Sequence, residues 1–422
     1  MRLSRSVLCV FICLISLSPV LAQDTTQQIV TGRSNRKEQL QKPYVILISA
    51  DGFRGDFADK YQAVNLQRLS KQGVRARYML PSFPSVTFPN HYSIITGLYP
   101  AHHGLVDNNF YDVTRDTTYG MANKKQVTDA YWYGGTPLWV LAEKQKMLSA
   151  SFYWVSSESN IQDTRPSYYY IYNEKINIDA RIQAVKNWLL LPEVKRPHFI
   201  TFYFPEVDHA AHTYGPDSKE AAAAVHFVDE AVGRLQAMTD SIKLPVNFVF
   251  VSDHGMTKVD NKNTLKLPAA VDTAKFYVPS GDALVHLYAR NKKDIVPTYL
   301  ALQKEAKDFD VYLSEDMPQK WHYSRKDDHY NRVGDILLIP RLPKVFNLGT
   351  RATSLGKHGY DPSFEDMHAS FFAWGPAFKK NMQVEGFENV HVYPLIANIL
   401  GLKYNEDMID GKAAVLKPVL KK

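Results

Sequence analysis

The chain is poor in cysteine. Its 422 residues include two, Cys9 and Cys13, and both lie in an amino-terminal segment with the pattern of an export signal. Once that segment is removed, no disulfide can form. The fold must therefore rely on a hydrophobic core and any bound metals, which excludes a small disulfide-stapled scaffold.

Long hydrophobic runs are also missing. The apolar stretch Val7–Leu17 has 11 residues, which is short for a bilayer span. It follows the basic residues Arg2 and Arg5 and precedes a small-residue cleavage site at 20–22. We therefore predict a signal peptide over residues 1–22, an exported protein that is periplasmic or secreted, and no membrane span after signal removal.

A concentrated positive charge is likewise absent. Removing residues 1–22 takes away two Arg and lowers the net charge from +7 to +5, and the remaining Lys and Arg are dispersed. No basic stripe of the kind that binds nucleic acid is evident. A small anionic substrate is compatible with this balance.

What the sequence does contain is an alternation of apolar runs and helix-like stretches, which predicts an α/β three-layer sandwich with a mostly parallel central sheet. The strand-like runs are 44–50, 150–155, 199–204, 246–252, 335–339 and 369–374, and the helix-like stretches are 64–72, 136–146, 178–190 and 219–239.

Composition suggests three further divisions. Residues 23–42 are polar and predict a disordered lead-in, and 43–422 would form the catalytic domain. A segment rich in Lys, Pro and Tyr predicts a smaller insertion subdomain at about 258–350.

Asp and His residues gather at the ends of the apolar runs. Asp51 ends the first run, Asp208 and His212 follow the run 199–204, Asp253 and His254 follow 246–252, and His358 precedes the run 369–374. Since buried parallel strands end at one edge of a sheet, this pattern predicts a site at that edge. Carboxylates and imidazoles together favour a pair of zinc-like divalent ions.

Two of these residues, Asp208 and His212, are four apart in the sequence. They would share one face if the turn is helical. With a distant third His they resemble a three-ligand catalytic zinc site.

The segment around Thr87 is the candidate nucleophile. Thr87 lies between Pro84 and Pro89, and Asn90–Gly97 predicts a helix with Asn90 near its cap. Thr87 would then lie at a helix amino terminus that favours an anionic phosphate, and metal coordination could activate its hydroxyl. A Thr in a Pro-rich loop is the alternative reading.

The motif SxTFPNHYSIxTGxYPxxHGxxxN starts at Ser85, with Asp51-Gly52 upstream and a DHGM motif at 253–256. It resembles the nucleotide pyrophosphatase/phosphodiesterase family (type I phosphodiesterases) of the alkaline phosphatase superfamily. The resemblance covers roughly Pro43–Leu402.

The resemblance implies two Zn²⁺ ions. One would be held by Asp51, Asp253, His254 and the Thr87 hydroxyl, and the other by Asp208, His212 and His358. By the same pattern His209 is not a ligand, and we interpret the other histidines of these segments, His91, His102, His103 and His368, as structural.

The family pattern also suggests substrate contacts. Asn108 matches the Asn that assists phosphate binding, and Phe88 and Tyr169 match the aromatic pair that stacks a nucleobase. The chain departs from the family at 154–157, where Trp-Val-Ser-Ser replaces the frequent Trp-Pro-Gly-Ser. The departure lies in the segment that carries the predicted base-stacking aromatic.

These expectations combine into a secreted two-zinc enzyme. It would hydrolyse nucleotide phosphodiester or phosphoanhydride bonds to nucleoside 5′-monophosphates through a covalent intermediate on Thr87. A choline-type phosphodiesterase and a phosphomonoesterase on the same scaffold are alternatives. A non-catalytic nucleotide- or metal-binding protein is the alternative of another class.

Overall fold

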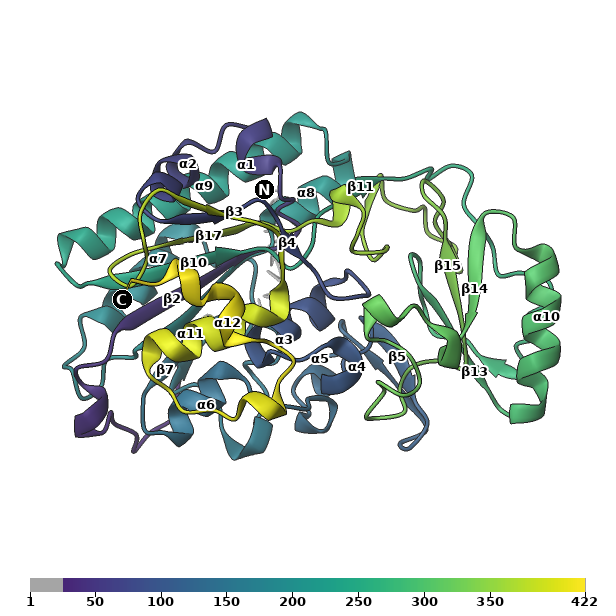
Figure 1. Cartoon of the computed structure of the whole chain (residues 1–422), viewed down its shortest axis with the longest axis horizontal. Coiled ribbons are helices and arrows are strands. Elements are labelled where there is room, and N and C mark those ends of the chain that lie inside the picture. Colours follow the sequence, from purple (N-terminus) through teal and green to yellow (C-terminus); the bar gives the residue numbers. More distant parts are fainter. Residues whose placement is uncertain (1–25, 422) are drawn as a thin grey trace, which may run out of the picture.

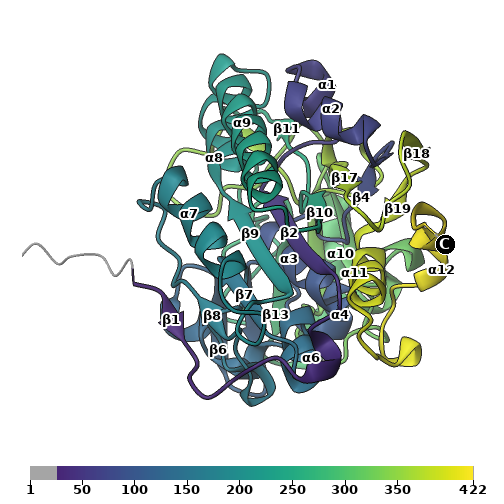
Figure 2. The same ribbon diagram turned by 90° about the vertical axis from the view of Figure 1, so that its left-hand side faces the viewer.

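The computed structural model describes residues 26–421, and a long mixed sheet runs through them (Figures 1 and 2). Among those residues the sheet has nine strands, in the order β1-β8-β7-β9-β2-β10-β17-β3-β18. In that order the bounds are Gln28–Ile29, Tyr168–Tyr169, Ser149–Phe152, Phe199–Phe204, Tyr44–Ala50, Val246–Val251, Phe371–Trp374, Val74–Ala76 and Met382–Val384.

The middle of the sheet is parallel. Each neighbouring pair in the series β8, β7, β9, β2 and β10 is parallel, whereas β17 runs antiparallel to both β10 and β3. Because β17 is reversed, its first residue, Phe371, lies opposite Val251 at the end of β10. The beginning of β17 therefore lies at the same edge as the ends of the parallel strands.

Helices cover both faces of the sheet, because alternate side chains of each strand point to opposite sides. Val45 and Leu47 of β2 join one core, and Ile46 and Ile48 join the other. The first core includes residues of α3 (Thr87–Thr96), α6 (Leu138–Lys144) and α11 (Val392–Leu400), and the second includes residues of α2 (Val64–Lys71), α7 (Ile178–Leu189) and α9 (Lys219–Ser241). Figure 2 shows the sheet between these two helical layers, which confirms the predicted α/β sandwich.

Short elements complete this main body. They are the helices α1 (Phe57–Lys60), α4 (Pro100–His103), α5 (Lys124–Val127) and α12 (Ala413–Leu416), the hairpin of β5 (Asn109–Asp112) and β6 (Thr117–Gly120), and the pair β4 (Met79–Leu80) and β19 (Phe387–Glu388).

A second, antiparallel sheet lies at the right of Figure 1. Its order is β12-β13-β15-β14, with bounds Phe276–Tyr277, Val285–Ala289, Ile336–Pro340 and Phe309–Leu313. With α10 (Ile295–Glu305) it encloses a core of its own that includes Leu302. The apolar run at 335–339 therefore belongs to this sheet, which lies within the predicted insertion at 258–350.

The chain leaves for this region and returns from it through two paired strands. β11 (Thr257–Lys258) directly follows the Asp253-His254 segment, and β16 (Gly356–Lys357) directly precedes His358. The two strands are antiparallel, with Thr257 opposite Lys357.

The predicted disordered lead-in at 23–42 is wrong over residues 26–42. β1 adds an edge strand to the main sheet through β8. The Asn35 amide donates to the carbonyls of Glu193 and Arg196 and accepts from the amide of Leu148. Backbone and amide hydrogen bonds of this kind leave no apolar pattern in the sequence.

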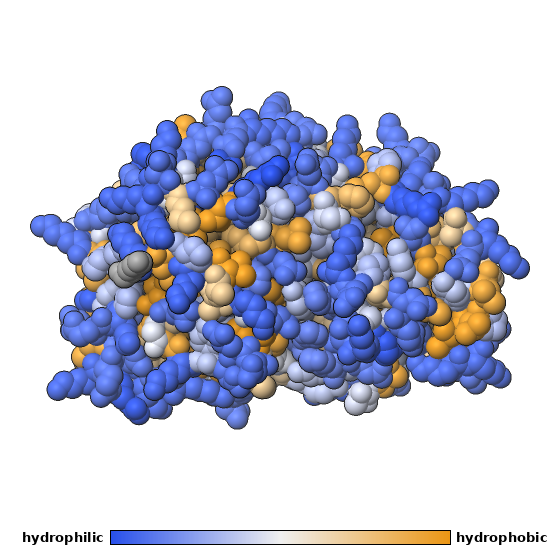
Figure 3. All heavy atoms as spheres, viewed as in Figure 1, coloured by the Kyte–Doolittle hydropathy of each residue, from blue (hydrophilic) through white to orange (hydrophobic). Residues whose placement is uncertain are grey.

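The predicted signal peptide at 1–22 lies outside the described residues. Within residues 26–421, no helix combines the length and the apolar character that crossing a membrane requires. The face in Figure 3 is mostly hydrophilic, and its apolar side chains form separate small patches.

Candidate metal centre and nucleophile

The polar residues at the strand ends come together at one edge of the central sheet. Asp51 directly follows β2, and Asp253 and His254 follow β10. Asp208 lies on α8 (Glu206–Tyr214), the helix that follows β9. His358 directly follows β16. Residues far apart in the chain thus form two adjacent clusters.

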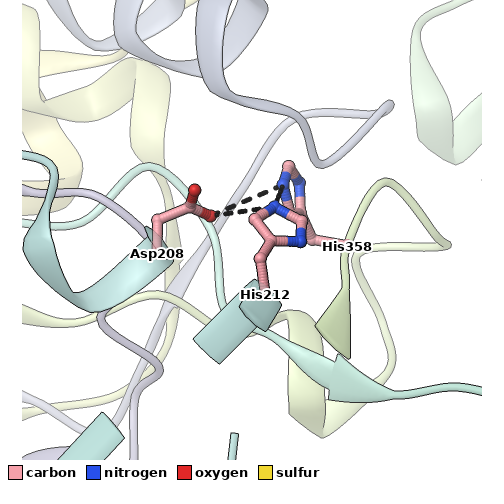
Figure 4. Close-up of side chains that lie close together, drawn as sticks. All are labelled: Asp208, His212 and His358. Atoms are coloured by element: carbon pink, nitrogen blue, oxygen red, sulfur yellow. Dashed lines mark hydrogen bonds and ion pairs between the residues drawn. The ribbon is translucent and has the colours of Figure 1, made fainter. Parts of the chain in front are cut away.

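The outer cluster consists of Asp208, His212 and His358 (Figure 4). Asp208 Oδ1 lies 3.3 Å from His212 Nε2 and 3.6 Å from His358 Nε2, and the two Nε2 atoms are 3.1 Å apart. Three potential ligand atoms therefore face one point, as a bound cation requires.

Backbone carbonyls orient both imidazoles of the outer cluster. His212 Nδ1 lies 2.7 Å from the Gly356 carbonyl oxygen, and His358 Nδ1 lies 2.8 Å from that of Ser85. A carbonyl can only accept, so each Nδ1 carries a proton and each ring turns its Nε2 toward Asp208. This arrangement is typical of metal-ligating histidines.

The inner cluster consists of Asp51, Asp253 and His254, and it contacts Thr87. His254 Nε2 lies 3.0 Å from Asp253 Oδ2, 3.4 Å from Asp51 Oδ1 and 3.2 Å from Thr87 Oγ1. The side chains of this cluster are at most 3% exposed, whereas the His212 side chain is 24% exposed. The inner cluster is thus enclosed and the outer one is accessible.

Side chains support the inner cluster. Tyr203 donates its hydroxyl to Asp51 Oδ2 at 2.6 Å. His91 Nδ1 lies 3.3 Å from Asp253 Oδ2, and its Nε2 lies 2.8 Å from Ser49 Oγ. His91, which the sequence suggests is structural, has a ligand atom close enough to those of Asp51 and Asp253 to share an ion with them.

The oxygens of the two clusters point to divalent cations. Asp51 Oδ1, Asp208 Oδ1 and Asp253 Oδ2 are buried without a hydrogen-bond partner among the described residues. A buried carboxylate oxygen without a partner is costly, and a coordinated cation would satisfy it. The donor set of carboxylates and imidazoles fits the expected Zn²⁺ ions.

Charge crowding supports the same conclusion. Burial, together with the nearby Asp253 and Asp208, raises the pKa of Asp51 well above its usual range. Burial also opposes ionisation of Asp253, but His254 and His91 outweigh it and hold the pKa of that carboxyl well below its usual range. Burial, with His254 and His212, lowers the pKa of His358 to about 3. His358 is therefore a neutral imidazole, the form that binds metal.

Thr87 is the first residue of α3, which begins three residues earlier than the predicted cap at Asn90. The helix can include Pro89 because the first-turn N–H groups have no helical partner to lose. Asn90 instead braces the preceding loop: it accepts from the Ser82 amide and donates to the carbonyls of Pro84 and Val86. The Thr87 hydroxyl lies at the positive end of the helix.

Asn108 lines the same cavity as Thr87. Its Oδ1 accepts from the backbone amide of Phe88 at 2.9 Å, which fixes the orientation of the side-chain amide. Asn108 lines the cavity beside Thr87, so its Nδ2 is available to donate to a ligand.

An aromatic cavity of about 410 Å³ opens on one side of Thr87. Phe88, Tyr172, Trp154 and Tyr153 line it, together with the carboxylates of Glu158 and Glu174. Tyr169, which we predicted to face Phe88, is not among the residues that line this cavity; it belongs to β8, opposite Gln28 of β1. Tyr172, three residues later, lines the cavity with Phe88.

A second cavity, of about 720 Å³, opens on the other side of Thr87. Its lining includes His212 and His358 of the outer cluster, Lys357, and the segments 280–282 and 346–354 from the region of the second sheet. The two cavities share Thr87, Met121, Asp208 and His209.

The other histidines lie outside the clusters. His209 is 54% exposed and lies 3.7 Å from Glu174, although it lines both cavities. His102 contacts Asp410, His103 contacts Ser93, and His368 stacks on Tyr78.

With this geometry in view, comparison with known proteins gives a clear class. Residues 45–361 match the family "Type I phosphodiesterase / nucleotide pyrophosphatase". The chain belongs to this family, as the sequence motifs predicted.

Two curated relatives illustrate the relationship. The chain is 34% identical to bovine ectonucleotide pyrophosphatase/phosphodiesterase family member 3 over 378 residues, and 34% identical to the venom phosphodiesterase of Macrovipera lebetinus over 371. These alignments cover 87% and 85% of this chain but only 43% of each relative. The chain thus spans less than half the length of these relatives.

The chain also resembles a solved structure over most of its length. Murine ectonucleotide pyrophosphatase/phosphodiesterase 5 is 28% identical, with a TM-score of 0.83 over 90% of this chain and 100% of the other. An inactive threonine-to-alanine variant of that murine protein in complex with AMP, 27% identical, gives the same TM-score and coverage. The likeness confirms the alkaline phosphatase-like α/β fold.

Sequence reasoning missed three residues of this site. Tyr203 directly precedes the last residue of β9, and a Tyr near the end of an apolar strand that leads to the site was the available signal. Tyr172 was one of several neighbouring tyrosines, and Lys357 adjoins the ligand His358. Only the three-dimensional arrangement distinguishes them from surface residues.

Proposed function

We propose that the protein is a secreted two-zinc nucleotide pyrophosphatase/phosphodiesterase. It would hydrolyse nucleotide phosphodiester or phosphoanhydride bonds and release nucleoside 5′-monophosphates. The supporting observation is the Thr87 hydroxyl at the start of α3, 3.2 Å from His254 Nε2 and on the wall of both cavities.

The residues present suit two Zn²⁺ ions. Asp51, Asp253, His254 and the Thr87 hydroxyl would hold one, and Asp208, His212 and His358 would hold the other. When bound, such ions lower the pKa of the hydroxyl and of the attacking water and offset phosphate charge.

Thr87 is the nucleophile of the proposed reaction. A bond forms between its Oγ1 and phosphorus while the bond from phosphorus to the leaving oxygen breaks, so the nucleotide becomes esterified to Thr87. The Thr proton passes to the leaving group or to solvent. Water then displaces Thr87 from phosphorus, returns a proton to Oγ1 and releases the monophosphate.

Asn108 and α3 would bind the phosphate. The Asn108 Nδ2 group can donate to a non-bridging oxygen, since its Oδ1 is already engaged by Phe88. The amino terminus of α3 adds the favourable end of a helix dipole. Both groups act on the charge that develops on the phosphate oxygens.

The nucleoside would enter the aromatic cavity between Phe88 and Tyr172. Stacking on aromatic side chains stabilises a base by about 1–3 kcal/mol. The AMP complex of the murine relative supports a nucleotide as the ligand of this class of site.

The test is the substitution Thr87→Ala, with Thr87→Ser as the conservative control. We expect Thr87→Ala to lower kcat by about a thousandfold or more on ATP and on the p-nitrophenyl ester of thymidine monophosphate. Thr87→Ser should keep part of the activity. Near-full activity of Thr87→Ala would rule out the covalent route, and no turnover by zinc-loaded wild type would favour a binding protein.

A choline phosphodiesterase is the second candidate, because the aromatic cavity also contains Glu158 and Glu174. Aromatic rings with nearby carboxylates can bind a quaternary ammonium. Higher kcat/KM on a phosphocholine ester than on any nucleotide would establish this alternative.

A phosphomonoesterase fits less well. Its substrate carries an additional charged oxygen, yet the residues that flank Thr87 are Val86 and Phe88, an apolar wall suited to a second ester substituent. A large preference for p-nitrophenyl phosphate over the nucleotide ester would reverse this choice.

The proposed cellular route follows from the amino terminus. Residues 1–22 would direct export and be removed, and the catalytic domain at 43–422, with its insertion at about 258–350, would act in the periplasm or outside the cell. Cleavage before Gln23 in the mature protein would verify this assignment.

A further inference from the structure

The two cavities beside Thr87 differ in chemistry. The aromatic cavity contains Asp51 of the inner cluster, whereas the second cavity contains His212 and His358 of the outer cluster. Lys357 and Arg351 line only the second cavity. The substituents on the two sides of a bound phosphorus therefore meet different surroundings.

We propose that the second cavity receives the group that leaves phosphorus, and that Lys357 makes it select leaving groups that carry phosphate. We call it the leaving-group cavity. This inference rests on the proposed function, because it deepens the specificity of the same site.

The position of the cavity follows from the direction of attack. In an in-line displacement the leaving oxygen departs on the side of phosphorus opposite the attacking Thr87 hydroxyl. The aromatic cavity takes the nucleoside, so the remaining opening is the leaving-group cavity. Water of the second step must then enter from the vacated side, where the outer cluster is accessible.

Lys357 is held in place at the wall of this cavity. It lies on β16, whose backbone pairs with β11, and its Nζ forms an ion pair with Asp282 Oδ2 at 2.6 Å. The Lys357 side chain is 16% exposed. A partly buried ammonium with donors to spare is a good partner for a phosphate oxygen.

The rest of the lining disfavours a cationic leaving group. Phe346 is the one aromatic residue among those that line the leaving-group cavity, so an aromatic cage for a quaternary ammonium is absent from this lining. Asp282 is paired with Lys357, and Asp107 lies 3.6 Å from His286. Arg351 adds a second cation.

The test compares two nucleotide substrates that differ in their leaving group. ATP releases pyrophosphate, whereas the p-nitrophenyl ester of thymidine monophosphate releases p-nitrophenolate, which carries no phosphate. The measured quantity is the ratio of the two kcat/KM values. We expect Lys357→Gln to lower this ATP-to-ester ratio about 10- to 100-fold, the effect of one charge-assisted hydrogen bond.

A matched control and an opposite variant sharpen the result. Lys258, exposed on β11 and paired with Gly356, should give an unchanged ratio as Lys258→Gln. Asp282→Asn should raise the ratio, because it leaves the Lys357 charge without its partner. NAD⁺, whose leaving group is a nucleotide, serves as a third substrate. The substrate whose kcat/KM falls more in Lys357→Gln, ATP or NAD⁺, identifies pyrophosphate or a nucleotide as the preferred leaving group.

Three outcomes would contradict the role of Lys357. An unchanged ratio in Lys357→Gln, equal losses on both substrates, or a fall in Asp282→Asn would overturn it. If the zinc-loaded wild type hydrolysed neither ATP nor the ester, the proposed function itself would fail, and the two failures are thereby distinguishable.

Discussion

The inner and outer clusters use the same residue types but are supported differently. Side chains hold the inner cluster: Tyr203 donates to Asp51, and His91 contacts Asp253. Backbone carbonyls orient the imidazoles of both clusters, those of Gly356 and Ser85 in the outer cluster and that of Gly255 at His254 in the inner one. The inner cluster is buried beside the proposed nucleophile and meets the aromatic cavity through Asp51, whereas all three residues of the outer cluster line the leaving-group cavity. This difference suggests a fixed site for attack and an accessible site for exchange of leaving group and water.

The largest expected effect separates the two steps of the reaction. Asp253→Asn and Asp208→Asn should each lower steady-state turnover by about a thousandfold or more, because each removes a charged ligand. With the p-nitrophenyl ester, Asp208→Asn should still release a burst of about one nitrophenolate per chain, since this leaving group departs without assistance. Asp253→Asn should show no burst. Rapid-mixing absorbance measures both, and equal bursts would contradict the division of roles.

Metal removal tests the difference in exposure. A chelator should withdraw ions in two phases, the faster from the outer cluster, because its His212 is 24% exposed and the inner side chains are at most 3% exposed. Zinc released over time, followed with a zinc-sensitive dye, should reach two per chain. Release in a single phase would mean that the two sites do not differ in access.

Support by side chains makes the inner cluster sensitive to the Tyr203 hydroxyl, which is not itself a predicted ligand. Tyr203→Phe should lower activity about 10- to 100-fold, the usual cost of losing a hydrogen bond to a metal ligand. Tyr170→Phe, on the ring that packs against Phe152, is the matched control and should change little. Equal behaviour of the two variants would show that the Tyr203 hydroxyl does not position Asp51.

The smallest effect concerns the aromatic cavity beside the inner cluster. Tyr172→Ala should raise KM for a nucleotide substrate about tenfold through lost stacking, and Tyr169→Ala should leave it near wild type. Methyl p-nitrophenyl phosphate, which has no base, should be hydrolysed alike by both. If Tyr169→Ala had the larger effect on the nucleotide, the assignment of Tyr172 would be wrong.

Much of the fold could be predicted because its signal is local. The apolar runs that became β2, β9 and β10 carry Asp and His just beyond their ends, and this pattern located both clusters. The start of α3 was misplaced because Pro89 looks like a boundary, although a first-turn proline costs no helical hydrogen bond.

The misplaced or missed residues depend on long-range geometry. Tyr169 and Tyr172 are three apart in a run of tyrosines, and only the folded chain shows that Tyr172 lines the cavity whereas Tyr169 pairs within the sheet. His91 resembles any buried histidine until the fold brings Asp253 within 3.3 Å of it. The edge strand β1 forms through backbone hydrogen bonds, which have no side-chain signature.

The pairing of β11 with β16 has a further consequence. Thr257 and Lys357 face each other across one ladder, so the residues between 258 and 356 form an excursion whose two ends are pinned together. Such an insertion can be exchanged as a unit. Lengthening, shortening or replacing it need not displace His254 before β11 or His358 after β16. We expect chimaeras joined at this ladder to keep their metal centre and Lys357, while the lining that residues 280–282 and 346–354 give to the leaving-group cavity changes with the donor.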